Sequence, residues 1–159
     1  MGTIEARTWE KSVETIMARE VVAADLHTTV KAAAEIMRSR RHSCLIVISK
    51  NLAVGIVTER DIVQKVTAEG VDPGKVFFED IMFTPLVTVR ATATIREVAE
   101  KMCTYEIRKM VVTDDQGRLV GLVTAGDLAK WLAEQKNYLD PALNAIARLK
   151  LPSEGGPYR

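Results

Sequence analysis

Apolar residues recur at helical spacing in two stretches of the chain. In both stretches the positions i, i+3, i+4 and i+7 are apolar: Val30, Ala33, Ala34 and Met37 in the first, and Ile95, Val98, Ala99 and Met102 in the second. This spacing places one apolar stripe along one face of a helix. Thr94 with Glu97 three residues later predicts a capping box at the start of the second helix, whereas Thr29 is followed at that position by Ala32 and predicts a weaker cap.

Short apolar runs rich in β-branched residues flank each predicted helix. They predict a short strand before each helix, at 21–22 and 87–89, and a strand pair after it, at 45–48 with 54–57 and at 110–112 with 119–123. Nearly continuous apolar character predicts a sheet that is covered on both faces. A second helix is expected after each pair, from Glu59 to about Thr67 and from Ala125 to about Tyr138. The pattern therefore predicts a β-α-β-β-α motif, twice, in a mixed α/β (α+β) fold.

The two copies also match residue by residue. Ile16-Met17 recurs as Ile81-Met82, an offset of 65 residues, and the segment 55–61 recurs as 121–127, an offset of 66. The extra residue falls where 114–117 predicts a hairpin turn, and turns are where single-residue insertions are tolerated. This internal repeat is the strongest organisational signal in the chain.

The repeat sets the predicted domain boundaries. We expect a first repeat at 9–67, a linker at 68–76, a second repeat at 77–138 and a tail at 139–159. Gly70, Pro73 and Gly74 interrupt any regular period in the linker. One repeat is too small to bury much of its own surface, so the two copies are expected to pack against each other. Within the tail, Pro141 predicts the first turn of a short amphipathic helix.

Composition narrows the possible functions. The formal net charge is +1, so no global positive field holds nucleic acid, and aromatic residues make up only 5% of the chain. No apolar stretch approaches the roughly 20 residues of a membrane span, and the first ten residues do not resemble a signal peptide. We therefore expect a soluble, cytoplasmic protein with no membrane association.

The cysteines and histidines do not predict a metal site. Cys44 and Cys103 stand in apolar segments without CxxC spacing, which predicts small buried hydrophobes rather than ligands. His27 and His42 have no Cys or His at metal spacing, and His27 is expected in an exposed loop. No catalytic motif is recognisable, so neither an enzyme nor a metal or other cofactor is expected.

The repeated motif at 55–61 and 121–127 carries the candidate chemistry. Gly55 permits close approach to the backbone, Thr58 starts a helix whose N–H groups suit a phosphate, and Asp61 can accept both hydrogens of a ribose diol. Gly121, Thr124 and Asp127 repeat this pattern. The same Thr-x-x-Asp spacing also predicts a capping box in which the aspartate satisfies a backbone N–H. The two roles can coexist.

A β-α-β-β-α repeat with Ile-Met near its start and G-h-h-T-x-x-D at its end resembles the CBS domain, the family named after cystathionine β-synthase. The resemblance covers about residues 10–131. It implies a tandem pair with internal pseudo-two-fold symmetry, usually a homodimer, that binds AMP, ADP, ATP or, less commonly, S-adenosylmethionine in clefts between the repeats. The nucleotide is expected as a ligand and not as a cofactor.

The resemblance also implies roles for particular residues. Thr58 and Thr124 would contact phosphate or ribose, and Asp61 and Asp127 would hold the ribose hydroxyls. An adenine slot would be lined by 18–23 and 83–87. The candidate ligand-binding set from both motifs, the slot and the neighbouring basic positions is Gly55, Thr58, Arg60, Asp61, Gly121, Thr124, Asp127, Arg108, Lys109, Val22, Met82, Thr84 and Val87.

The two copies differ in charge around the motif. Glu59 places a negative charge where a phosphate is expected, although Arg60 offsets it, whereas the second copy has small residues there. Arg108 and Lys109 stand where family members place basic phosphate contacts, and a solvated strand edge is an alternative interpretation of the pair. We therefore expect the Thr124/Asp127 cleft to be the better site.

Three functions remain open from the sequence. The first is a non-catalytic sensor of an adenine nucleotide that acts on a separate, unknown protein partner. The second is a dimerisation scaffold without ligand, in which the Thr-x-x-Asp motifs are only caps. The third is a nucleic-acid-binding regulator, for which Arg38, Arg40 and Arg41 supply only a small basic cluster.

Overall fold

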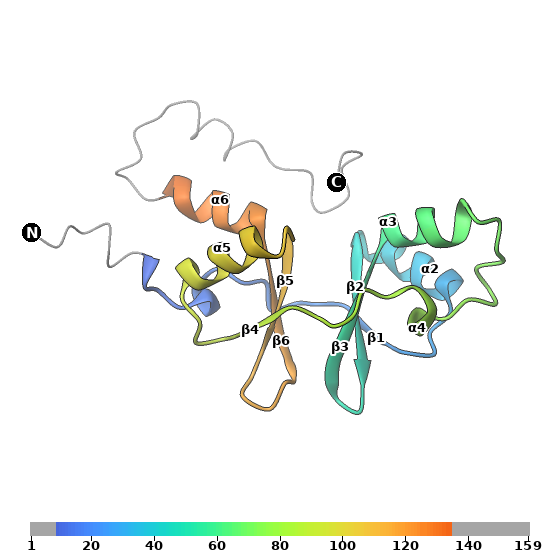
Figure 1. The fold of residues 1–159 in the computed structure, drawn as a ribbon, viewed down its shortest axis with the longest axis horizontal. Coiled ribbons are helices and arrows are strands. Elements are labelled where there is room, and N and C mark those ends of the chain that lie inside the picture. The colour runs from blue at the N-terminus through green and yellow to red at the C-terminus, as the bar shows by residue number, and fades with distance from the viewer. Residues whose placement is uncertain (1–8, 135–159) are drawn as a thin grey trace, which may run out of the picture. The chain divides into compact units, whose positions relative to one another are not determined.

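The computed structural model describes residues 9–134, and the chain divides into two compact units. Unit 1 joins residues 9–20 to residues 87–134, and unit 2 comprises residues 21–86. Each unit contains one three-stranded sheet, with strand order β1-β2-β3 in unit 2 and β4-β5-β6 in unit 1. The predicted mixed α/β (α+β) fold with a duplicated motif is confirmed (Figure 1).

Unit 2 is built on a mixed sheet in which β1 is parallel and β3 antiparallel to β2. Its elements are β1 (Ala23–Asp25), α2 (Val30–Arg40), β2 (Cys44–Ser49), β3 (Leu52–Thr58), α3 (Glu59–Ile62), the π-helix η2 (Val63–Thr67) and α4 (Phe78–Ile81). The apolar face of α2 packs on the sheet and on Phe78, whose side chain is fully buried. The predicted helical stripe thus forms one side of the core.

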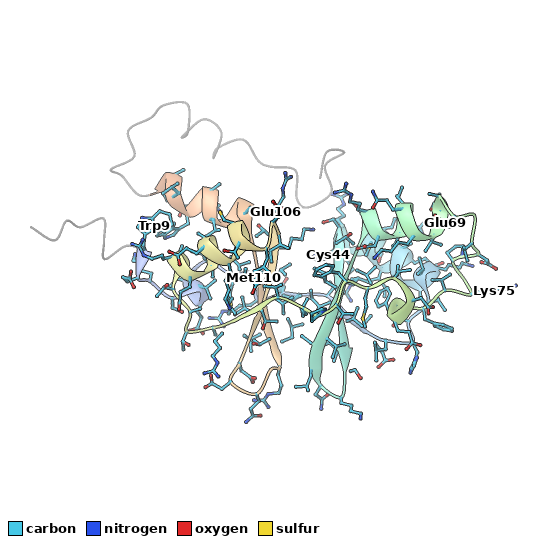
Figure 2. All side chains as sticks on the ribbon, viewed as in Figure 1. Trp9, Cys44, Glu69, Lys75, Glu106 and Met110 are labelled. Carbon is cyan, nitrogen blue, oxygen red and sulfur yellow. The ribbon has the colours of Figure 1, made fainter. Side chains whose placement is uncertain are left out.

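Unit 1 repeats this arrangement. Its elements are the 3₁₀-helix η1 (Val13–Thr15), β4 (Thr88–Arg90), α5 (Ile95–Thr104), β5 (Lys109–Thr113), β6 (Leu119–Thr124) and α6 (Ala125–Glu134). Strand β4 is parallel and β6 antiparallel to β5. Val98 and Met102 of α5 pack with Met110 of β5 and Val13 of η1 in a second core. The buried Trp131 of α6 meets Trp9 edge to face, with ring centroids 5.0 Å apart; Trp9 lies beside the helices of this unit in Figure 2.

Several predicted bounds need correction. The first strand begins at Ala23 rather than at 21, because Val22 contributes only its carbonyl, which accepts from the N–H of Ile46. The predicted helix at 59–67 changes from α to π after Ile62. The short helices η1 and α4 were not predicted, since 3–4 residues are too few to show a period. The predicted end of the last helix at Tyr138 and the tail helix at Pro141 lie outside the described residues.

The segment that opens each sequence repeat packs in the unit built around the other repeat's sheet. Ala18 exchanges two backbone hydrogen bonds with Leu122 of β6, at 2.8 and 2.9 Å. Phe83 does the same with Ile56 of β3, at 2.9 and 3.4 Å. The sequence repeats and the compact units are therefore different divisions of the chain, with the opening segments exchanged.

Burial in the central strands agrees with the apolar runs. Leu45, Ile46 and Val47 are consecutive in β2 and all have 0% exposure, so both faces of the sheet are covered at these positions, as predicted. Cys44 is buried as expected, but Cys103 is exposed. It follows Met102 on α5 and so lies about 100° around the helix from the buried stripe. Among residues 9–134, no helix combines the length and apolar character that crossing a bilayer requires.

The predicted capping box of α5 is confirmed, and it lowers the pKa of a carboxyl group. Hydrogen bonds from the backbone N–H and the hydroxyl of Thr94 to Glu97, at 2.6 and 3.1 Å, hold the pKa of Glu97 below its usual range. Thr29 caps α2 with a single bond from the N–H of Ala32, at 3.3 Å, and no carboxylate returns it. The two caps form a natural comparison.

Thr94→Ala is expected to lower the free energy of unfolding by about 1 kcal/mol near neutral pH. A depressed carboxyl pKa stabilises the fold above the unfolded-state pKa, and this contribution is lost as the pH falls through the folded-state pKa. The cost of Thr94→Ala should therefore shrink on acidification, whereas the cost of Thr29→Ala should not. Urea unfolding of both variants near pH 7 and in mild acid measures this, and equal pH dependence of the two would contradict it.

Candidate functional site

Both Thr-x-x-Asp motifs form complete reciprocal caps. In unit 2, the Oδ2 atom of Asp61 accepts from the backbone N–H of Thr58 at 2.9 Å and from its hydroxyl at 2.6 Å, and the Asp61 N–H donates to that hydroxyl at 3.2 Å. In unit 1, Asp127 and Thr124 make the same bonds at 2.8, 2.7 and 3.2 Å. The predicted capping role is therefore present in both copies. The hydroxyl hydrogen of each threonine is donated to the aspartate, so it reaches a phosphate only if the cap opens.

The two aspartates differ at their second oxygen. Oδ1 of Asp61 forms an ion pair with Nζ of Lys65 at 2.9 Å, and the Asp61 side chain is only 17% exposed. For Oδ1 of Asp127, the structure gives no partner within residues 9–134. Because a carboxylate oxygen offers two lone pairs, this one atom can accept hydroxyl hydrogens from a diol while Oδ2 keeps the cap.

Fewer N–H groups at the N-terminus of α6 are available to a phosphate than the sequence suggests. Its first N–H, from Ala125, donates to the carbonyl of Arg108 at 2.9 Å, and the N–H of Asp127 donates to Thr124. These two N–H groups are therefore not available to a phosphate. The positive end of the ten-residue helix still favours an anion near it.

Two basic residues of unit 1 stand beside the start of α6 along the backbone. Arg108 is exposed immediately before β5, and its carbonyl is tied to the start of α6. Lys109 stands directly opposite Thr124 in the β5–β6 register. In unit 2 the corresponding positions hold Ser43 and Cys44, so two cations are replaced by two neutral side chains. The charge difference expected from the sequence therefore coincides with the difference at the aspartates.

The glycines of the two motifs are explained by packing. A Cβ placed on Gly55 would lie 2.5 Å from Sδ of Met82, and one on Gly121 would lie 2.6 Å from Sδ of Met17. The close approach expected at each glycine is thus made by a methionine of the exchanged segment. Ligand contact by Gly55, Gly121 or Met82 stays a prediction, because the structure already supplies a neighbour at both glycines.

Several backbone groups in the segments expected to recognise adenine already form hydrogen bonds within the protein. Ala18 and Phe83 each use both their N–H and their carbonyl in pairing with a strand. The Val22 carbonyl accepts from Ile46 at 3.1 Å, and the Thr84 hydroxyl donates to the carbonyl of Val54 at 3.3 Å. Val87, by contrast, is recorded with no such hydrogen bond among the described residues. The N–H groups of Ala18 and Phe83 are therefore already used, and ligand contact by Val22, Thr84 and Val87 stays a prediction.

The candidate residues fall into two groups, one in each unit. Unit 2 contains Val22, Gly55, Thr58, Arg60, Asp61, Met82 and Thr84, and unit 1 contains Val87, Arg108, Lys109, Gly121, Thr124 and Asp127. Arg60 is exposed, and no ion pair to Glu59 is recorded in the described residues. Lys65 was missed by sequence reasoning, although its i+4 spacing from Asp61 is the spacing of a helical ion pair.

A family model for the CBS domain matches residues 13–68 and 78–134, and the chain belongs to this family. Both matches agree with the fold, since each spans a β-α-β-β-α motif. The predicted resemblance and its tandem arrangement are therefore confirmed. CBS pairs are typically regulatory ligand-binding modules, and the chain has the architecture of such a pair.

Individual relatives add detail. The chain is 35% identical over 118 residues to the uncharacterised protein MK0525 of Methanopyrus kandleri, a match covering 74% of this chain and 60% of that protein. It is 30% identical over 118 residues to the CBS domain-containing protein YhcV of Bacillus subtilis, covering 74% of this chain and 83% of YhcV. Among solved structures, the CBS domain pair of protein MJ0100 in complex with 5-methylthioadenosine and S-adenosylmethionine superposes with a TM-score of 0.70 at 28% identity, covering 78% of this chain and 97% of that one.

Proposed function

We propose that this chain is a non-catalytic regulatory module that binds an adenine nucleotide, AMP, ADP or ATP, at the Thr124–Asp127 motif of unit 1. S-adenosylmethionine is the second choice of ligand. The observation that carries the proposal is the second carboxylate oxygen of Asp127, which lies on a capped helix start beside Arg108 and Lys109. A carboxylate oxygen suits a ribose diol, and adjacent cations suit the phosphates of the same ligand.

The comparison with MJ0100 supports the chemical class of the ligand. Both compounds in that structure contain adenosine, so a CBS pair of similar fold accommodates an adenine and a ribose. The basic pair Arg108 and Lys109 is our reason for placing a phosphate-bearing ligand before S-adenosylmethionine. We further propose that the module is a homodimer in the cytoplasm and passes its signal to a separate protein.

Thermal unfolding with and without ligand tests the proposal. A ligand present at about 100 times its Kd adds about 2.7 kcal/mol, which for a chain of this size raises the Tm by roughly 5–11 °C. We expect this shift with one of AMP, ADP, ATP or S-adenosylmethionine and not with GMP. Asp127→Asn should abolish the shift, because the amide keeps an oxygen for the cap but loses the second acceptor. Asp61→Asn is the matched control and should keep it.

A second candidate function is favoured by the completeness of both caps. If the Thr-x-x-Asp motifs only cap their helices and bind no ligand, the chain is a dimerisation scaffold. Protein freed of co-purified nucleotide that shows no shift with any adenine compound, yet sediments as a dimer, would favour the scaffold. An equal shift with GMP would contradict adenine selectivity.

A further inference from the structure

The side chain of Lys65 is held at two points within unit 2. Its Nζ atom lies 2.9 Å from Oδ1 of Asp61 and 2.6 Å from the carbonyl oxygen of Ile81, to which it donates. Ile81 ends α4, the helix of the exchanged segment, while Lys65 lies on η2 directly after α3. One ammonium group therefore neutralises Asp61 and satisfies the last helical residue of α4. Displacing it exposes a carbonyl as well as breaking an ion pair.

Unit 1 has no cation at the equivalent position. With the offset of 66 residues, Lys65 corresponds to Trp131, which is 7% exposed and packs edge to face on Trp9. An indole has no positive charge to offer a carboxylate. The helix also differs, since α6 is a continuous α-helix and the unit 2 segment changes to a π-helix after Ile62. The two units thus share the same capping motif, but its second carboxylate oxygen is ion-paired in unit 2 and has no recorded ion-pair partner in the described part of unit 1.

We propose that Lys65 is a specificity-determining residue that withholds Asp61 from a ribose diol, so that each chain binds one adenine nucleotide, at Asp127. This inference rests on the proposed function and adds a reason why Asp127, and not Asp61, binds the nucleotide. A diol at Asp61 would have to replace a charged partner with neutral hydroxyls in a site where the carboxylate is 17% exposed. At Asp127 the diol meets a carboxylate oxygen for which no ion pair is recorded within residues 9–134, so no such pair has to be broken.

The test uses the full chain and counts bound AMP and ATP, titrated separately by calorimetry and by tryptophan fluorescence. Both tryptophans of the chain, Trp9 and Trp131, lie in unit 1, and Trp131 is one helical turn beyond Asp127. Fluorescence therefore reports binding at Asp127, while calorimetry reports binding at either aspartate. The variants are Lys65→Met, which keeps the chain length without the charge, Asp127→Asn, and the two combined. Lys130→Met is the matched control, because it removes a lysine near Asp127 with which no ion pair is recorded in residues 9–134.

Wild type and Lys130→Met should bind one nucleotide per chain, seen by both methods. Lys65→Met should bind two, with at least about a tenfold gain in affinity at Asp61. The double variant should keep one site, at Asp61, that calorimetry counts. If wild type and folded Lys65→Met both bind one nucleotide per chain, the proposed role of Lys65 is overturned but the proposed function is not. Loss of binding in Lys65→Met has the same meaning. Absence of binding in every chain overturns the proposed function as well.

Discussion

Phe78→Ala is expected to lower the free energy of unfolding by about 3–5 kcal/mol, the usual cost of removing a buried aromatic ring. The Phe78 side chain has 0% exposure and packs in the core of unit 2 with Val30 and Val57. Alanine leaves a cavity between α4 and the α2–sheet layer that the surrounding side chains can fill only in part. Urea unfolding followed by circular dichroism measures the change.

Hydrogen exchange tests the arrangement more specifically, because it shows which unit is destabilised. Phe78 belongs to the second sequence repeat but packs with β1–β3, so hydrogen exchange should accelerate in residues 23–58 before residues 88–124. Val13, the equivalent residue of η1, has 0% exposure in the core of unit 1. Val13→Ala should produce the reverse pattern with a smaller loss. Faster exchange of β4–β6 in Phe78→Ala would contradict the exchanged arrangement.

The exchange of opening segments marks the limit of what the sequence can predict. Helices α2 and α5 follow directly from their apolar period and from Thr29 and Thr94, because these signals are local. Which strand Ala18 or Phe83 joins is a tertiary choice. Leu122 and Ile56 occupy equivalent places in nearly identical motifs, so local pattern gives both segments two similar partners. Only the folded chain distinguishes them.

The candidate site was also predictable from the sequence only where local spacing determines it. The capping box was predicted as one role of Thr58 and Asp61, and it is present because three-residue spacing at a strand–helix junction determines it. The state of the second carboxylate oxygen depends on Lys65, whose ammonium must also reach the carbonyl of Ile81 in a segment 16 residues away. The π-helix that carries Lys65 leaves no recognisable sequence signal. The preference for Asp127, which the sequence suggests through Arg108 and Lys109, stays a prediction.

Gly121→Ala is expected to lower the free energy of unfolding by about 1–3 kcal/mol, the range for an extra methyl group in a packed interior. The new Cβ would lie 2.6 Å from Sδ of Met17 and 2.9 Å from the carbonyl oxygen of Ala18. The methionine can change rotamer, but the Ala18 carbonyl accepts the N–H of Leu122 at 2.9 Å and cannot move without weakening that pair. The variant should therefore loosen the pairing of the opening segment with β6.

Gly55→Ala is the matched comparison in unit 2. The nearest atoms to its new Cβ all belong to the Met82 side chain, at 2.5, 3.1 and 3.2 Å, so a flexible group can relieve the clash and the cost should be smaller. Combining Gly121→Ala with Met17→Ala should cost less than the sum of the two single changes, because the second removes one of the two clashes. Urea unfolding followed by the fluorescence of Trp9 and Trp131, both in unit 1, measures this coupling. Strict additivity would show that Met17 does not determine the need for glycine at 121. A full rescue would show that the Ala18 carbonyl imposes no constraint of its own, because that clash remains in the double variant.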